Sequence, residues 1–495
     1  MFSNMKEIIK ICVCVLILFS CLNCSDKISS IPADIEINDF VWKGMNAYYY
    51  WQSDVPNLGD GRFSNQAEIN NFSASFETPE DIFESVRFQP GIVDRFSWIV
   101  DDYVALENAF QGIRLSNGME FNLYTNQTNS NNVYGVVYYV IPGSDAEKKG
   151  VLRGMVFSGI NNTQITVSNY RDLLTNAASV NYTLNLANFS AGDPILNGTE
   201  INLSKEQLQE NPVAITKVFN EGSKKIGYLL YNQFANSFDG QLNASFGYFK
   251  EENITDLIID LRYNGGGSVR TATYLASMIN GTNTGKLFSQ EIWNEKVMNS
   301  RAPEYFLNNF TDQILNTDSN GTILINEPIN SLSLQKVYFI ISEATASASE
   351  LIINGMRPYI DVRLVGTKTV GKQVGSVTLY DSDTFSRNGP NLNANHTYAI
   401  QPIVLEIKNA NSENDPEGYI ADDYLPENFG REDGIIDLGV LGFKTDPLLN
   451  TAITSIIAGF KSNKSIKFSF RDKPLMNSKS EALFSQEMYI EEIRN

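Results

Sequence analysis

Apolar strands alternate with helices along residues 224–376, and this alternation constrains the fold more than any other feature of the chain. The segment "ITDLIIDL" has the pattern of a buried strand, and the helical pattern "VRTATYLASMI" follows it after a run of three glycines. The same order returns where "KVYFII" is followed by "ASELIINGM". Short apolar runs rich in β-branched residues predict buried strands, and their alternation with helices predicts a mixed α/β fold.

Two regions of different composition precede this one. In the first, aromatic residues are dense in "NDFVWKGMNAYYYWQ", and Thr78 followed by Pro79 predicts a helix start. The second has strand-like runs separated by turn residues, with one short helix at "DAEKKG". A chain of 495 residues is too long for one hydrophobic core. The predicted parts are a helical N-terminal domain at 37–103, a β-rich domain at 104–215, a mixed α/β domain at 216–450, and a helix with a polar tail at 451–495.

The first 24 residues have the order of a secretory signal. Two lysines precede a short apolar run, and all four cysteines of the chain fall between positions 12 and 24. The segment "LFSC" resembles a bacterial lipoprotein signal, which implies a signal peptide at 1–20, a tether at 21–36 and an acylated Cys21, with Cys24 as the second candidate. We therefore expect an exported, lipid-anchored protein of a bacterial cell envelope, on the periplasmic face or the cell surface.

Charge and residue types exclude several classes of function. The formal net charge of −19 leaves no basic surface for a nucleic acid. His396 is the only histidine, and no cysteine follows position 24, so a zinc site of nitrogen and sulfur ligands is excluded. The acidic groups at 381–383 and 421–423 lack the spaced ligands of a calcium loop and are interpreted as solvated loops. We expect no metal and no cofactor.

A cluster of hydroxyls surrounds the break between strand and helix in "YFIISEATASASELIINGM", residues 338–356. A serine at the start of a helix directs its oxygen toward free backbone N–H groups, where the helix dipole stabilises negative charge. The same position suits a helix cap and a nucleophile. The cluster alone leaves both interpretations open for Ser342, Thr345, Ser347 and Ser349.

If the cluster holds a nucleophile, its general base is a carboxylate or a lysine. His396 follows "NLNAN" in a polar stretch, and we interpret it as a surface residue. A lysine can act as base only when burial lowers its pKa from about 10.4 toward 7 or 8. Lys372 follows a glycine and an apolar strand, 25 residues after Ser347, and Lys368 is the nearby alternative.

"TASASE" followed by "GK" at this distance resembles the C-terminal processing peptidases, or tail-specific proteases, which are Ser/Lys-dyad enzymes with an embedded PDZ domain. The similarity extends over roughly residues 94–450 and includes "DLRYNGGG". It implies Ser347 as nucleophile and Lys372 as general base. It also implies an oxyanion hole formed by the backbone amides of Gly266, beside Gly265, and of Ala348.

The resemblance also implies a fold and a peptide site. The fold is a mixed α/β multidomain chain with a helical N-terminal domain, a β-rich PDZ domain and an α/β catalytic domain of the ClpP/crotonase type. A PDZ domain binds an extended peptide at a sheet edge, and the loop at Gly118, Met119 and Glu120 is the expected carboxylate-binding end. The chain departs from the family pattern after the lysine, where Gln373 or Ser376 replaces the usual orienting glutamine, unless backbone alone orients Lys372.

These residues predict a serine endopeptidase that cleaves exported polypeptides near their C-termini. Its expected partners are the C-terminal tails of unfolded or loosely folded polypeptides, and the membrane through the lipid anchor. The altered residues after Lys372 motivate the alternative, a peptide-binding scaffold of the same fold that has lost turnover.

Overall fold

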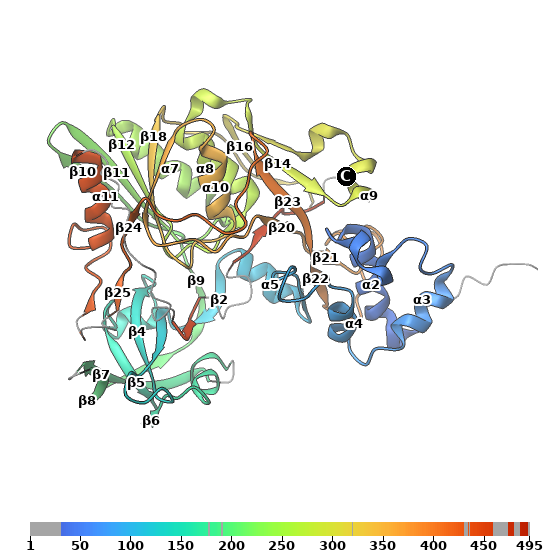
Figure 1. Ribbon diagram of the computed structural model, residues 1–495, viewed down its shortest axis with the longest axis horizontal. Helices are drawn as coiled ribbons and strands as arrows, with labels where there is room; N and C mark the ends of the chain where they lie inside the picture. The colour runs from blue at the N-terminus through green and yellow to red at the C-terminus, as the bar shows by residue number, and fades with distance from the viewer. Residues whose placement is uncertain are drawn as a thin grey trace, which may run out of the picture.

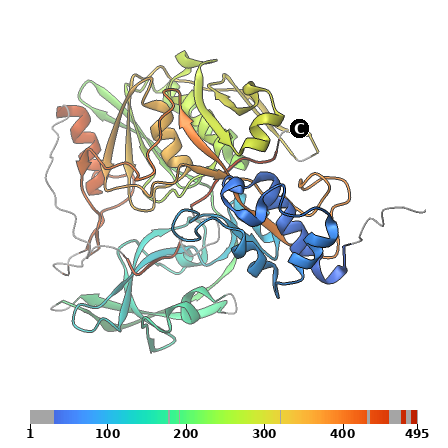
Figure 2. The same ribbon diagram turned by 45° about the vertical axis from the view of Figure 1, so that its right-hand side comes forward.

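The computed structural model describes residues 31–176, 179–189, 192–318, 320–429, 434, 436–458, 474–479 and 486–493 (Figure 1). The expected signal peptide, Cys21 and Cys24 lie outside these residues. In the part of the chain that is described, no helix is both long and apolar enough to cross a membrane. Figures 1 and 2 both show three bodies: a helical N-terminal part, a β-rich unit, and a larger α/β body that contacts each of them.

The N-terminal part is helical, as its sequence predicts. Thr78 begins the third of its helices: its hydroxyl accepts a hydrogen bond from the Asp81 amide, and the Asp81 carboxylate accepts one from the Thr78 amide. This reciprocal pair satisfies two free N–H groups at the helix start. A small sheet, β1–β22–β21, joins this part to the α/β body. The elements are α2 (Glu36–Tyr48), α3 (Gln66–Ser73), α4 (Pro79–Ser85), α5 (Tyr103–Phe110), β1 (Trp98–Val100), β21 (Leu379–Tyr380) and β22 (Ala399–Gln401).

The β-rich unit is one sheet in the order β27-β3-β4-β5-β7-β8, with β6 paired to β5. Its core is apolar, and the helix predicted at "DAEKKG" is present as α6. The edge strand β27 comes from the C-terminal end of the chain, more than 300 residues away in sequence from β3. The elements are β3 (Met119–Thr125), β4 (Val133–Val140), α6 (Asp145–Lys148), β5 (Val156–Ile160), β6 (Thr163–Gln164), β7 (Asn181–Phe189), β8 (Pro194–Ser204) and β27 (Met476–Asn477).

The α/β body contains a six-stranded sheet in the order β10-β11-β12-β18-β19-β24. Strands β11, β12, β18, β19 and β24 are parallel, and the first three crossovers, from β11 to β12, β12 to β18 and β18 to β19, contain the helices α7, α8 and α10. The elements of this layer are β10 (Val213–Glu221), β11 (Lys224–Tyr231), α7 (Asp239–Glu251), β12 (Asp256–Asp260), α8 (Val269–Ile279), β18 (Lys336–Ile341), α10 (Ala348–Met356), β19 (Asp361–Gly366), β24 (Asp423–Tyr424) and α11 (Pro447–Ala458).

Each face of this sheet has its own apolar core. On one face, Ile259 and Phe339 pack in a cluster with Leu351 of α10. On the other, Ile258 packs in a cluster with Leu449 of α11. Burial on both faces explains why β12 and β18 read as continuous apolar runs in the sequence.

A second sheet of the α/β body has the order β13-β28-β20-β23-β14-β15. Its second strand, β28, again comes from the C-terminal end of the chain. The polar tail of the segment 451–495 also contributes to the hydrophobic cores, because Met476 and Met488 are buried in two different ones. The elements are β13 (Gly267–Ser268), β14 (Leu287–Trp293), β15 (Leu307–Asn309), β20 (Val374–Ser376), β23 (Ile403–Asn409) and β28 (Met488–Tyr489).

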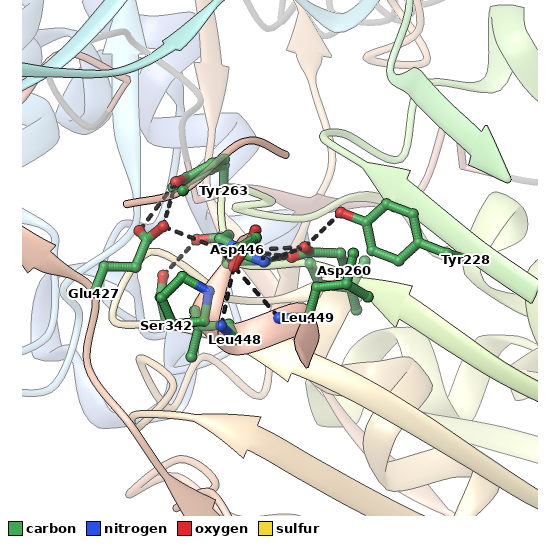
Figure 3. A network of polar contacts seen from close by, with 12 residues as sticks. Tyr228, Asp260, Tyr263, Ser342, Glu427, Asp446, Leu448 and Leu449 are labelled. Carbon is green, nitrogen blue, oxygen red and sulfur yellow. Dashed lines mark hydrogen bonds and ion pairs between the residues drawn. The ribbon is translucent and has the colours of Figure 1, made fainter. Parts of the chain in front are cut away.

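A buried polar network links the β-rich unit to the α/β body (Figure 3). The guanidinium of Arg262 is fully buried. One of the carboxylates that pair with Arg262, that of Glu427, also pairs with Arg153 of the β-rich unit at 2.6 Å. The Tyr263 hydroxyl donates to the same carboxylate at 2.7 Å. The network fixes the backbone just before the glycine cluster at 265–267. The carboxylates around Arg262 are Asp260 at 2.6 Å, Asp446 at 2.8 Å and Glu427 at 3.0 Å.

Candidate active site

Ser347 occupies the turn between β18 and α10. Its φ of +65° lies in the left-handed region, which costs a non-glycine residue about 1–3 kcal/mol. The side chain is fully buried, and its Oγ has no hydrogen-bond partner among the residues that the structure describes. The turn thus presents one strained, unengaged hydroxyl at the start of a helix.

The other hydroxyls of the cluster have structural partners. Ser342 Oγ donates to the carbonyl of Arg262, Thr345 Oγ1 donates to that of Leu261 at 2.9 Å, and Ser349 Oγ donates to that of Asn264 at 3.0 Å. All three acceptors belong to the segment that carries the glycine cluster. These hydroxyls therefore hold the serine turn against the glycine cluster.

Glu350 joins the serine turn to the lysine turn, and the sequence analysis did not assign it a role. One carboxylate oxygen accepts from the backbone amides of Ser347 at 2.9 Å and Lys372 at 2.8 Å. The other accepts from the amide of Gly371 at 2.7 Å and the Thr369 hydroxyl at 2.5 Å. Burial raises the pKa of Glu350 against these hydrogen bonds. The serine-x-x-glutamate spacing of a capping box was the available sequence signal.

Lys372 is fully buried, with its Nζ 4.8 Å from the ring centroid of Phe96. Burial lowers the pKa of Lys372 from its ordinary value, and the nearby charge of Glu487 opposes this shift. The Nζ donates to the Gln486 carbonyl at 2.7 Å and lies 3.2 Å from Glu487 Oε2. Lys368, the alternative base, is only half-buried. The fully buried lysine is the one suited to act as a neutral amine.

The Glu487 carboxylate is the polar partner of Lys372 that the sequence did not suggest. It also accepts from Trp98 Nε1 at 2.9 Å and from Ser376 Oγ at 2.9 Å, and Gln401 Nε2 donates to that hydroxyl at 2.9 Å. Ser376, one predicted orienting residue, therefore contacts Lys372 only through Glu487. No sequence signal places position 487 beside position 372, because the two positions lie 115 residues apart in the chain.

Gln373, the other predicted orienting residue, does not contact the lysine amine. Its side chain is buried, and within the described ranges neither its amide nitrogen nor its amide oxygen has a hydrogen-bond partner. The expectation that Gln373 orients Lys372 is wrong in this structure. Residue 373 follows the lysine directly in an extended segment leading into β20, so adjacent side chains point in different directions.

The glycine cluster lies directly against the serine turn. A Cβ on Gly266 would lie 2.7 Å from Ser347 Cβ and 3.0 Å from the Ala348 amide nitrogen, so only glycine fits here. Ala348 is the first residue of α10, and its amide has no acceptor within the helix. The Gly266 amide donates to Asn264 Oδ1 at 2.9 Å, which engages the predicted oxyanion donor. The next amide, of Gly267, donates instead to the Glu487 carbonyl at 2.5 Å.

The predicted peptide-binding loop lies at the start of β3. Side chains within the loop already accept hydrogen bonds from two of its amides, those of Gly118 at 2.9 Å and Met119 at 3.0 Å. Glu120 is buried, pairs with Arg114 and accepts a hydrogen bond from Ser478 Oγ at 2.5 Å. In this structure the amides of Gly118 and Met119 are therefore already hydrogen-bonded within the loop and are not free to bind the carboxylate of a peptide.

A cavity of 1110 Å³ lies between the β-rich unit and the α/β body. Residues of both bodies line it, including Asn122 and Tyr124 of β3 and Gly265 and Gly266 of the glycine cluster. Strand β3 and residues 341–344, which lead into the serine turn, thus border one space.

His396 takes no part in this site. Its Nε2 lies 3.0 Å from Asp381 Oδ2, and its Nδ1 accepts from the Tyr398 amide at 3.0 Å. Its side chain is only 8% exposed, so its interpretation as a surface residue is wrong. Among the described residues, no group of three or more His, Cys, Asp or Glu side chains is placed to bind a metal.

Comparison with known families agrees with this geometry. The model of "Peptidase family S41" matches residues 225–385, and that of "Peptidase S41 N-terminal domain" matches residues 36–98. Two regions of the chain are thus similar to the two domains of peptidase family S41. The first match includes Ser347 and Lys372, and the second covers the helical N-terminal part.

Individual members of the family are similar to the chain over part of their length. Carboxyl-terminal-processing peptidase 2, chloroplastic, of Arabidopsis thaliana is 24% identical over 249 residues, which cover 48% of this chain and 41% of that protein. The carboxy-terminal-processing protease of Bartonella bacilliformis is 26% identical over 328 residues, 60% of this chain and 65% of the relative. The chain thus spans less than two thirds of either relative.

A solved S41-family structure shares the fold. The crystal structure of a chain from Bacteroides fragilis NCTC 9343 has a TM-score of 0.62 and 22% sequence identity. The match covers 85% of this chain and 98% of that one. The mixed α/β architecture is therefore the S41 architecture.

Proposed function

We propose that the chain is a serine endopeptidase of the C-terminal processing type. The observation that carries the proposal is the single buried carboxylate of Glu350, which accepts the backbone amides of both Ser347 and Lys372. It fixes a strained, unengaged serine hydroxyl and a buried lysine on facing turns. A buried lysine and a left-handed serine both cost folding free energy, so their presence on two turns joined by one carboxylate favours a catalytic role over the inactive scaffold.

In the proposed mechanism Lys372 acts as a neutral amine, because burial lowers its pKa. It takes the proton of Ser347 while Oγ attacks the substrate carbonyl carbon. The carbonyl oxygen becomes an oxyanion beside the Ala348 amide and the glycine cluster. The second donor is either the Gly266 amide, once it is released from Asn264, or the Gly267 amide. Each such donor contributes about 2.7–4 kcal/mol of transition-state stabilisation.

Collapse of this intermediate breaks the C–N bond, and the protonated lysine gives its proton to the leaving amine. Water then attacks the acyl-enzyme, with Lys372 again accepting a proton, and Ser347 is regenerated. The products are a new carboxylate and a new amine terminus, so the cycle needs no metal or cofactor.

We also propose the roles of the other parts. The β-rich unit acts as a PDZ domain that binds extended C-terminal tails of loosely folded polypeptides at the edge of β3. The chain is exported and anchored to a bacterial membrane through a lipid on Cys21, or on Cys24. The domain boundaries at 37–103, 104–215 and 216–450 describe its helical, PDZ and catalytic parts.

A serine-directed fluorophosphonate tests the proposal, together with cleavage of an unstructured polypeptide. We expect labelling and cleavage by the wild type, loss of both in Ser347→Ala, and loss of cleavage in Lys372→Ala. His396→Ala is the matched control and retains both activities. Cleavage that survives Ser347→Ala, or is lost in His396→Ala, would refute the Ser/Lys dyad.

A further inference from the structure

The C-terminal segment of the chain occupies a peptide position on the β-rich unit. Met476 and Asn477 of β27 pair antiparallel with β3. The amide of Leu475 donates to the Leu123 carbonyl at 2.7 Å, and that of Ser478 donates to the Phe121 carbonyl at 2.9 Å. The segment therefore runs toward the start of β3, where the Gly118 loop lies. This is peptide binding by strand addition, with the peptide supplied by the chain itself.

The same segment then occupies a second strand position at the dyad. Met488 and Tyr489 of β28 pair parallel with Gly267 and Ser268 of β13, and Tyr489 also pairs with Ser376 of β20. Strand β13 follows the glycine cluster, and β20 follows Lys372. The segment thus fills the strand position between the strand that follows the glycine cluster and the strand that follows Lys372.

Contacts at the dyad engage the lysine with this segment. Both hydrogen-bond acceptors of Lys372 Nζ belong to it: the Gln486 carbonyl and the Glu487 carboxylate. The Glu487 carbonyl oxygen lies 2.4 Å, and Ser347 Cβ 2.7 Å, from the position of a Cβ on Gly266, so the two are neighbours. Ser347 Oγ meanwhile has no hydrogen-bond partner in the described part of the chain. The segment thus forms hydrogen bonds to the proposed base, Lys372, while the proposed nucleophile, Ser347, is fully buried.

Side chains hold the segment in place at both positions. Met488 is fully buried, and the Tyr489 ring stacks on Phe110 with centroids 4.3 Å apart. Glu491 accepts a hydrogen bond from Ser268 Oγ at 2.5 Å and pairs with Arg270 at 3.3 Å. The segment is therefore bound by apolar, ionic and backbone contacts.

We propose that residues 474–479 and 486–493 are an intramolecular ligand of the substrate site, which occupies both peptide-strand positions and must withdraw before a polypeptide substrate binds. Both positions bind an extended peptide, and the peptide at the second position carries an acidic side chain opposite Lys372. The inference rests on the proposed function for its effect on turnover, but binding of the segment can be measured without turnover.

Tethering explains how a weak ligand closes the site. A segment linked in cis acts at an effective concentration of about 1 mM, so a peptide affinity of about 100 µM closes roughly ten of every eleven molecules. Weakening the segment is therefore expected to raise turnover by up to about tenfold.

Full-length variants test the inference. Ser478→Pro removes a backbone donor to β3, and Glu487→Gln removes the charge opposite Lys372. We expect each to raise the cleavage rate of an unstructured peptide severalfold and up to about tenfold. Glu492→Gln is the matched control, because the exposed Glu492 carries the same charge in the same segment. Its rate should equal that of the wild type.

A labelled synthetic peptide with the sequence of residues 474–493 gives a readout that needs no activity. It should bind the inactive double variant Ser347→Ala/Ser478→Pro about tenfold more tightly than Ser347→Ala alone, where the tethered segment competes. Equal binding to both proteins would overturn the inference. So would a fall in turnover in Glu487→Gln, since Glu487 would then position the base of a working site. Tighter peptide binding without cleavage by any variant would support the inference and refute the proposed function.

Discussion

Replacing Glu350 by glutamine tests how the dyad is held. Four donors converge on the carboxylate: the amides of Ser347 and Lys372 on one oxygen, and the Gly371 amide and Thr369 hydroxyl on the other. A glutamine has one acceptor oxygen, and its NH₂ group faces the remaining two donors. Each buried donor left without an acceptor costs about 1–3 kcal/mol. Two such donors predict a loss of about 2–6 kcal/mol in the free energy of unfolding.

Urea unfolding followed by tryptophan fluorescence measures this loss, and peptide cleavage measures its effect on the dyad. We expect Glu350→Gln to lower both the unfolding midpoint and the turnover. Glu417→Gln, at an exposed position, is the control and should change neither. If Glu350→Gln unfolds at the wild-type urea concentration and cleaves at the wild-type rate, Glu350 does not hold the two turns together.

Other substitutions test the charges around the site. Because burial lowers the pKa of Lys372, the cleavage rate should rise with pH through a pKa below 10.5, as the amine loses its proton. Because the Glu487 charge raises that pKa, Glu487→Gln should move the rise to lower pH, and a pH–rate profile measures both effects. Lys372→Met should abolish cleavage and lower the thermal midpoint, because it leaves the buried Glu487 carboxylate without its cation. Arg262→Met leaves buried carboxylates uncompensated and should lower the free energy of unfolding by about 3–5 kcal/mol, measurable in urea; an unchanged midpoint would contradict the role of this network.

The sequence predicted the parts of this structure that depend on local pattern. Alternating apolar strands and helices indicated the sheet of β11, β12, β18 and β19, and Thr78 with Pro79 indicated a helix start. The hydroxyl cluster and the glycine-flanked Lys372 indicated the two turns that the fold brings together. These signals are local because each depends on residues within one turn or one strand.

The missed features depend on contacts between distant segments. Glu487 lies 115 residues from Lys372. Nothing in the polar C-terminal sequence indicates that it contains two short strands, β27 and β28, that belong to two different sheets. Gln373 was favoured by its place beside the lysine, yet extended backbone directs its side chain elsewhere. His396 was interpreted as exposed because its neighbours are polar, whereas pairing with Asp381 buries its side chain.

Mapping a fluorophosphonate adduct by mass spectrometry, on full-length protein with Ser478→Pro, tests the dyad most directly. The account predicts one adduct, on Ser347, that forms more slowly in the presence of the 474–493 peptide and is absent when Lys372→Ala is added. An adduct on another serine, or labelling of Ser347 at the same rate without the lysine, would contradict it.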